Sequence, residues 1–441
     1  MAESLPAQAA STGRQRPSTF RALRHPNFRL FFFGQLISLV GTWMQTIAQQ
    51  WLVYRLTGSA TMLGIISLLG IIPLLPMSLW GGSLADRLPK RNIMLVAQTV
   101  MMLQAFLLAA LLYAKAVQVW HVMLLSVVLA AANAVDIPAR QAFIVEMVEG
   151  KEDLANAIGL NSAIFNGARA IGPALAGIAV ATTGEAGAFL VNGISFLFVI
   201  ASLLLMRLPP HTAPEQRAPF ASHLGEAVRY VRKEQAVLVL ISLVAVSAFL
   251  SMPYSTLLPV FASKVLNQSA QSVLDFVCGP ESTLGMSCRS PGALTYGLLM
   301  AATGLGAVMG ALFVASMPPT TRRGGWLTLG NLSFPLLIVF MALSRSFLLS
   351  CLLLVGIGFS FVVQNALCNT LIQISVPNEL RGRVMSFYSL TFQGMMRMGG
   401  MQAGVMGDTL GAPLAVGIGG VICLAYGLFV ALRYPKVREM A

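Results

Sequence analysis

The chain consists mainly of long apolar runs separated by short polar segments. A helix that crosses a lipid bilayer needs about 20 mostly apolar residues, and runs of that length recur along the whole sequence. The pattern predicts an all-α membrane protein with twelve transmembrane helices. The predicted spans are 30–54, 61–84, 92–114, 119–138, 157–182, 187–206, 236–261, 294–316, 326–344, 347–372, 384–407 and 411–432.

The polar stretch 207–235 follows the sixth span and divides the spans into two groups of six. Within this stretch Leu224, Val228 and Val231 share one face among basic residues, which predicts an amphipathic interfacial helix. Two related six-helix halves are an architecture for alternating access, with a substrate site between them. The predicted domains are a cytoplasmic tail (1–29), an N-terminal bundle (30–206), a cytoplasmic linker (207–235), a C-terminal bundle (236–432) and a second cytoplasmic tail (433–441).

Composition excludes a soluble globular protein. Hydrophobic residues make up 56% of the chain and charged residues 10%, whereas soluble domains carry about 25% charge. The net charge of +13 is explained without nucleic acid, because Lys and Arg accumulate in cytoplasmic loops of membrane proteins. With the N-terminus inside, 22 basic residues fall on inner segments and 5 on outer loops. We therefore expect a multi-pass protein of the cell membrane with both termini cytoplasmic.

The sequence offers no chemistry for an enzyme. The four histidines, His25, His121, His211 and His223, all lie outside the middle of the spans, and no catalytic set or metal-ligand spacing is present. No phosphate-binding Walker loop occurs, so no intrinsic ATP drive is expected. We predict neither a cofactor nor a metal. If the protein moves a solute against its gradient, the energy must come from an ion gradient.

The loop between spans two and three reads Gly81-Gly82-Ser83-Leu84-Ala85-Asp86-Arg87-Leu88-Pro89-Lys90-Arg91. It resembles the G-x-L-A-D-R loop of the major facilitator superfamily. An Asp beside three cations at the membrane edge can form ion pairs that hold one conformation. We therefore predict a conformational role; the alternative is a solvated basic loop. The predicted residues of this gate are Gly82, Asp86, Arg87, Lys90 and Arg91.

Span five contains Gly172-Pro173 and Gly177, similar to the Gly-Pro helix motif of exporters in that superfamily. Gly172 and Ala176 form a stripe of small residues suited to close helix packing, and Pro173 permits a bend. Further segments resemble the enterobactin-exporter-like efflux branch, although the loop between spans seven and eight is longer. These segments are Trp43-Met44-Gln45, Asp136-Ile137-Pro138-Ala139-Arg140 and Gly225-Glu226-Ala227-Val228-Arg229-Tyr230-Val231.

Polar side chains inside the spans are candidates for a substrate cavity. Arg169 and Arg397 lie near helix centres, where an Arg costs about 2.5–3.5 kcal/mol on insertion scales and usually faces a bundle interior. They could recognise an anionic or polar substrate, or be satisfied structurally by backbone carbonyls. The amides could line the cavity or act as hydrogen-bonding glue between helices. The candidates are Gln45, Gln49, Asn166, Arg169, Asn365, Asn369 and Arg397.

Asp136 and Arg140 are four residues apart at the inner end of span four and share a helical face. The preferred interpretation is a cytoplasmic gate in which they pair with Arg87, Lys90 or Arg91. The alternative is that Asp136 carries a proton, since burial raises the pKa of a carboxylate.

Cys278 and Cys288 share a polar outer loop. A disulfide could close this loop if the compartment is oxidising. The alternative is that both cysteines are free.

The favoured function is a proton-coupled exporter of small amphipathic compounds, drug-like or siderophore-like, that works by alternating access. The alternatives are an importer or facilitator for a lysophospholipid or nutrient, and a receptor or scaffold that transports nothing. The expected partners are a small-molecule substrate, protons and the lipid bilayer, and the expected state is a monomer that binds no nucleic acid.

Overall fold

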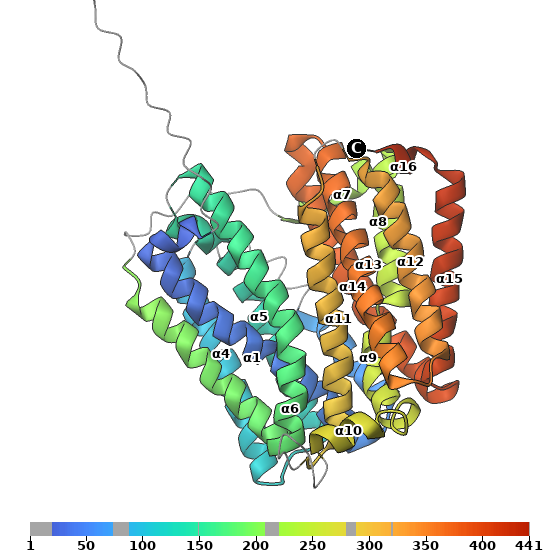
Figure 1. Cartoon of the computed structure of the whole chain (residues 1–441). Helices are drawn as coiled ribbons and strands as arrows, with labels where there is room; N and C mark the ends of the chain where they lie inside the picture. Colours follow the sequence, from blue (N-terminus) through green and yellow to red (C-terminus); the bar gives the residue numbers. More distant parts are fainter. Residues whose placement is uncertain are drawn as a thin grey trace, which may run out of the picture.

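The computed structural model describes residues 20–73, 88–148, 150–207, 220–278, 288–318 and 321–440. All regular secondary structure in these ranges is helical, which confirms the predicted all-α class (Figure 1). The N-terminal half contains η1 (Arg21–Arg24), α1 (Pro26–Thr57), α2 (Ala60–Leu69), α4 (Lys90–Tyr113), α5 (Val119–Met147) and α6 (Lys151–Leu205).

The C-terminal half follows from residue 220. Its elements are α7 (Phe220–Lys233), α8 (Gln235–Val246), η2 (Ser247–Ser251), α9 (Tyr254–Val260), η3 (Phe261–Val265), α10 (Gln271–Cys278), α11 (Pro291–Ala315), α12 (Arg323–Leu343), α13 (Phe347–Ser375), α14 (Asn378–Thr409), α15 (Ala412–Arg433) and α16 (Lys436–Glu439). The segments η2 and η3 are π-helical turns, so they widen the helix on either side of α9.

Nine helices in the described ranges are long and apolar enough to cross a membrane. The longest, α6, has non-helical backbone at Gly184 (φ 79°), which lies between the predicted spans 157–182 and 187–206. The predicted span 61–84 begins with α2 and continues into residues 74–87, which lie outside the described part of the chain. The count of twelve spans therefore stays a prediction.

Glycines bring the two halves into close contact along two pairs of helices. A Cβ on Gly64 of α2 would lie 2.7 Å from the carbonyl oxygen of Gly400 in α14. A Cβ on Gly177 of α6 would lie 3.0 Å from the Cα of Gly297 in α11. In lipid the hydrophobic effect does not drive apolar helices together. Close backbone packing at small residues therefore stabilises contacts of this kind.

The two bundles meet along only part of their length. In Figure 1 they approach one another near α10, and their ribbons separate toward the end of the molecule that carries α7, α16 and the C-terminus. The helix α7 lies within the predicted linker, where it buries Ala227 and Val231 and pairs Glu226 with Arg383 of α14. It therefore packs on the C-terminal half.

The contact between Gly177 and Gly297 yields a stability prediction. We expect Gly177→Ala to lower the melting temperature of the purified protein, because overpacking against backbone costs about 1–3 kcal/mol. Gly167→Ala, on the same helix, is the matched control, since a Cβ there meets nothing within 4 Å. This control should be neutral or stabilising, because Ala is the better helix former. Equal melting temperatures for the two variants would contradict the packing interpretation.

Candidate functional site

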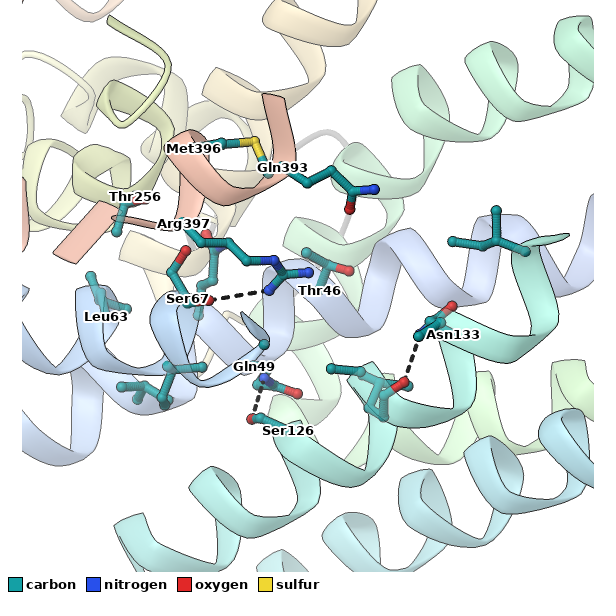
Figure 2. A pocket seen from close by; sticks show the side chains of 18 of the residues that line it. Thr46, Gln49, Leu63, Ser67, Ser126, Asn133, Thr256, Gln393, Met396 and Arg397 are labelled. Atoms are coloured by element: carbon teal, nitrogen blue, oxygen red, sulfur yellow. Dashed lines mark hydrogen bonds between the residues drawn. The ribbon is translucent and has the colours of Figure 1, made fainter. Parts of the chain in front are cut away.

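A cavity of about 480 Å³ lies between the two halves. Its walls come from α1, α2 and α5 on one side and from α9 and α14 on the other (Figure 2). The lining mixes apolar side chains with amides and hydroxyls, and Arg397 is its one charged side chain among the described residues. The polar lining residues are Thr46, Gln49, Gln50, Ser67, Ser126, Asn133, Thr256, Gln393 and Arg397.

Arg397 reaches from α14 across to α2. Its Nη1 donates a hydrogen bond to the carbonyl oxygen of Ser67 at 3.1 Å. The guanidinium can approach this closely because residue 70 is glycine: a Cβ there would lie 1.7 Å from Nη1. The same carbonyl oxygen also accepts the backbone N–H of Gly70 at 3.3 Å. Within the described part of the chain the buried Nε has no hydrogen-bond partner.

Two polar side chains of the N-terminal wall form hydrogen bonds within their own half. Gln49 donates from Nε2 to Ser126 Oγ at 2.9 Å, while its buried Oε1 has no partner among the described residues. Asn133 donates to the carbonyl oxygen of Leu129 at 3.0 Å, one turn earlier on α5. The Gln49 side chain is therefore held against α5 within the N-terminal half.

Gln45 forms hydrogen bonds between helices and does not line this cavity. Only 1% of its surface is exposed. Its Nε2 donates to Gln104 Oε1 of α4 at 2.7 Å, and its Oε1 accepts from Asn192 Nδ2 of α6 at 2.5 Å. The sequence left two roles open for Gln45, cavity lining and hydrogen bonding between helices. The structure gives it the second role, within the N-terminal bundle.

Arg169 lies between the halves but outside the lining of this cavity. Its guanidinium carbon is 5.8 Å from the Trp43 ring centroid on α1 and 5.6 Å from the Phe361 ring centroid on α13. Cation–π contacts on two aromatic rings compensate part of the desolvation of a buried guanidinium. Arg169 therefore links the N-terminal half to α13.

The other three candidates also lie away from this cavity. Asn166 donates to the carbonyl oxygen of Ser162 in its own helix at 2.9 Å. On α13, Asn369 accepts a hydrogen bond from Gln373 at 2.6 Å, and Asn365 is half-buried. Of the seven predicted cavity residues, the structure brings Gln49 and Arg397 together around one space.

The predicted inner gate is only partly within the described residues. Gly82, Asp86 and Arg87 lie outside them. Lys90 pairs with Glu146 at the end of α5, and Arg91 donates to the carbonyl oxygen of Leu204 at 2.9 Å. Both cations are therefore engaged within the N-terminal half.

Asp136 does not pair with Lys90 or Arg91 in this conformation. It is fully buried and forms an ion pair with Arg140, whose Nε lies 3.1 Å from its carboxylate, and it accepts from Gln98 Nε2 at 3.0 Å. The (i, i+4) spacing on α5 favours the pair within one helix, because the two side chains project from the same face. In this conformation Asp136 belongs to a network of α4 and α5, and its expected contact with Arg87 lies outside the described residues.

The predicted Gly-Pro segment of α6 packs in two directions. A Cβ on Gly172 would lie 2.5 Å from the Cβ of Trp43 in α1, whereas Gly177 faces α11. The carbonyl oxygen of Pro173 would lie 2.8 Å from a Cβ on Gly297. This segment therefore fits α6 between its own bundle and the other half.

Four polar contacts join the halves near α10. Trp51 Nε1 donates to Ser290 Oγ at 3.1 Å, and the Tyr296 hydroxyl donates to Gln50 Oε1. Ser263 Oγ donates to the Tyr54 hydroxyl at 3.1 Å. The backbone N–H of Arg289 donates to the carbonyl oxygen of Ala181 at 2.6 Å. These contacts close the cavity at this end of the molecule.

Asp408 is a residue that the sequence analysis missed. From the end of α14 its carboxylate accepts the Ser59 hydroxyl at 2.5 Å and the backbone N–H groups of Ala60 and Thr61 at 2.8 and 2.9 Å. It therefore caps the N-terminus of α2, a helix of the other half, where the helix dipole favours negative charge. The sequence does show an acidic residue at the outer end of predicted span eleven. Its partner lies about 350 residues away, so no local sequence pattern indicates the contact.

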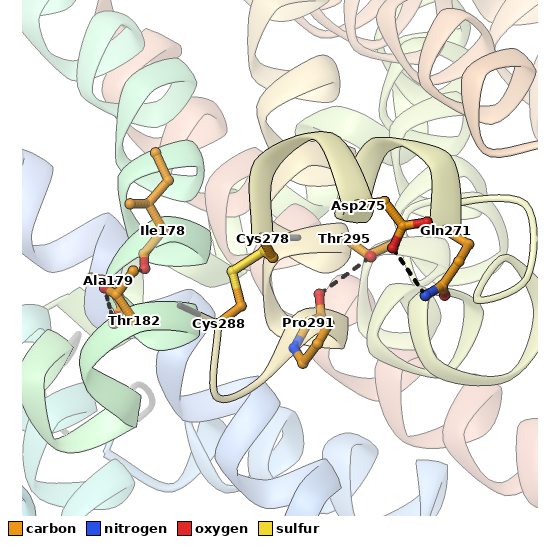
Figure 3. Close-up of a disulfide and its surroundings, with 9 residues drawn as sticks. All are labelled: Ile178, Ala179, Thr182, Gln271, Asp275, Cys278, Cys288, Pro291 and Thr295. Carbon is orange, nitrogen blue, oxygen red and sulfur yellow. Dashed lines mark hydrogen bonds between the residues drawn. A yellow bond between two sulfur atoms is a disulfide. The ribbon is translucent and has the colours of Figure 1, made fainter. Parts of the chain in front are cut away.

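The structure joins Cys278 and Cys288 in a disulfide with a Cα–Cα distance of 5.4 Å (Figure 3). Cys288 immediately precedes Arg289 and Ser290, which both contact the N-terminal half. The bond therefore ties α10 to a segment that helps to close this end of the molecule. The remaining cysteines, Cys351, Cys368 and Cys423, are free.

Two helical bundles around a shared cavity, with apolar helices throughout, define a multi-pass membrane transporter rather than an enzyme. The profile of the transmembrane secretion effector family matches residues 17–274 and 287–441. The chain belongs to this family of the major facilitator superfamily, and the predicted resemblance is confirmed.

Characterised relatives cover nearly the whole chain. The staphyloferrin A transporter of Staphylococcus aureus is 23% identical, over 93% of this chain and 97% of that protein. The multidrug efflux pump Tap of Mycolicibacterium fortuitum is 24% identical over 92% of each chain. The enterobactin exporter EntS of Citrobacter koseri is 25% identical, over 90% of this chain and 86% of that one. Efflux transporters are thus among its relatives.

Solved structures show the same fold. A bacterial homologue of the human lysosomal transporter Spinster, in an inward-facing and unoccupied conformation, aligns with a TM-score of 0.68 at 15% identity, covering 95% of this chain and 99% of that one. A POT family transporter in complex with 5-aminolevulinic acid aligns with a TM-score of 0.70 at 13% identity, covering 93% and 96%.

The disulfide leads to a direct chemical prediction. When the purified protein is denatured without reductant and treated with a maleimide, we expect three thiols to react, because three of the five cysteines are free. After reduction all five should react, and peptide mass spectrometry should assign the two new adducts to Cys278 and Cys288. Alkylation of both residues before reduction would contradict the bond.

Proposed function

We propose that this protein is a secondary active exporter of small amphipathic compounds. The observation that carries the proposal is the cavity between the halves, whose lining combines apolar side chains with amides and one guanidinium. Relatives named as siderophore and multidrug exporters support the direction of transport. Both termini would lie in the cytoplasm, as the excess of basic residues on the predicted inner segments favours.

Alternating access is the proposed mechanism. With this orientation, the contacts near α10 lie on the outer side, and the described conformation is closed there. The polar contacts between the halves at the α10 end favour an opening on the opposite, cytoplasmic side. Export then requires the halves to rock, which breaks the outer contacts and forms inner ones in their place.

The proposed outer gate is the contact between Asp408 and the first turn of α2. Outward opening must separate α14 from α2, and this leaves three hydrogen-bond donors of Ser59, Ala60 and Thr61 without their acceptor. The contact therefore stabilises the outward-closed state relative to the outward-open one.

Proton exchange is the proposed source of work, and Asp136 is the proposed coupling residue. It is fully buried, and its neighbours Ile137 and Pro138 line the cavity. Protonation would cancel its ion pair with Arg140 and so change the charge of the inner part of α5. The gate role of Asp136 stays an alternative prediction, since Arg87, one of its expected partners, lies outside the described residues.

For proton coupling we predict that Asp136→Asn abolishes the response of transport to an imposed pH gradient while leaving downhill flux measurable. Asn keeps the size of the side chain but cannot ionise. The measurement is uptake of a compound panel into everted membrane vesicles, with and without the gradient. Glu146→Gln serves as the control, since it removes another carboxylate of α5 that pairs with Lys90. An undiminished gradient response in Asp136→Asn would exclude Asp136 as the coupling residue.

For the outer gate we predict that Asp408→Asn shifts the conformational equilibrium toward the outward-open state. Asn keeps one acceptor oxygen but removes the negative charge that the start of α2 favours, which is worth about 0.3–1 kcal/mol, so the outward-open population should rise about two- to fivefold. Spin labels on the exposed residues Lys115 and Arg345 would report the change as longer distances between the halves.

The matched control for this experiment is Asp275→Asn. Asp275 is an exposed carboxylate on α10 that accepts a hydrogen bond from Gln271 of the same helix. The Asp275→Asn substitution removes the same charge and leaves the contact between the halves intact. Identical distance distributions for Asp408→Asn and Asp275→Asn would argue against the gate.

A further inference from the structure

We infer that Arg397 is the binding site for the anionic group of an amphipathic substrate, with a carboxylate as the simplest example. The inference rests on the proposed transport function and specifies its substrate class. It starts from the charge of the cavity: among the described lining residues there is one guanidinium and no carboxylate. The space between the halves is therefore electrostatically positive.

A guanidinium in the middle of a membrane protein requires compensation. Buried charges are stable when they are paired and hydrogen-bonded, and leaving one unpaired is strongly destabilising. Arg397 has one hydrogen bond, to a neutral carbonyl, and a buried Nε without a partner in the described chain. Among the described residues the guanidinium therefore has a neutral partner and no carboxylate.

The carboxylates that might have supplied this charge are engaged elsewhere. Asp136 binds Arg140 and Gln98 within the N-terminal half. Asp408, on the same helix as Arg397, caps the first turn of α2. Neither of these carboxylates of the described chain pairs with Arg397, so we expect its counter-ion to arrive with the ligand.

The geometry leaves room for such a ligand. Nη1 is held by the Ser67 carbonyl, which orients the planar guanidinium, and Nη2 remains for a charge-assisted hydrogen bond to a carboxylate. Figure 2 shows the Arg397 and Gln393 side chains extending from α14 toward Thr46 of the opposite wall. The Arg397 side chain therefore projects into the space where a ligand would lie.

The rest of the cavity suits the apolar part of an amphipathic anion. Leu63 and Ile66 of α2 and Met396 of α14 line it alongside the polar groups. A methionine side chain adapts to different apolar shapes. The predicted substrate is a compact molecule with one anionic end and an apolar body.

The test uses two fluorescent probes that differ only in charge. N-dansyl-leucine carries a carboxylate, and N-dansyl-leucinamide is its neutral counterpart with the same apolar body. Binding to the purified full-length protein is followed by dansyl fluorescence. A hydrogen bond to a charged group contributes about 1.5–3 kcal/mol, so we expect the wild type to bind the carboxylate at least about tenfold more tightly than the amide.

Variants assign this preference to Arg397. Arg397→Gln should bind the two probes equally, to within about twofold, and Arg397→Lys should retain part of the preference because it keeps the charge but not the planar fork. Arg433→Gln is the matched control: it removes an exposed guanidinium at the end of α15, which contacts the ring of Tyr434, and should behave as wild type.

The outcomes separate this inference from the proposed function. Equal affinity of the wild type for both probes would overturn the anionic substrate class. An unchanged preference in Arg397→Gln would remove the role of Arg397. Tight and selective binding of N-dansyl-leucine, without any movement of it across the membrane of reconstituted vesicles, would support the anion site and contradict the exporter.

Discussion

The contact between α2 and α14 is the constraint on which the rest of the structure depends. Their backbones touch at Gly64 and Gly400, so no side chains separate the two halves there. In lipid the association of helices gains nothing from burying apolar surface, and close packing with polar contacts has to provide it. The polar contacts lie toward opposite ends of α2: Asp408 at the first turn and Arg397 near the last.

The two charges suit the polar groups that α2 presents to them. The unpaired N–H groups at the start of α2 favour an anion, and the Ser67 carbonyl oxygen further along accepts from the Arg397 guanidinium. Because α14 supplies both, it fits α2 in one orientation and one register. A rocking motion that lifts α14 away from α2 must weaken both contacts together, so the cost of opening is concentrated in this one pair of helices.

How much was predictable depends on the distance over which each interaction acts. The helical class and most spans follow from local runs of apolar residues. The role of Gln45 could not be predicted, because its partners Gln104 and Asn192 belong to other helices. Asp408 was missed for the same reason. Arg169 and Arg397 looked alike in the sequence, since both are isolated cations in predicted spans. Only the packing places Arg397 at a cavity wall and Arg169 between two aromatic rings.

The position of Arg397 links substrate binding to the movement of the halves. When α14 separates from α2, the guanidinium loses the Ser67 carbonyl, and an empty carrier would then hold an unpaired cation inside the membrane. A bound anion compensates that charge, so it lowers the free energy of opening for the loaded carrier relative to the empty one. By thermodynamic reciprocity, whatever opens the contact between α2 and α14 also strengthens anion binding at Arg397. The residue that recognises the substrate would then also disfavour outward opening without cargo.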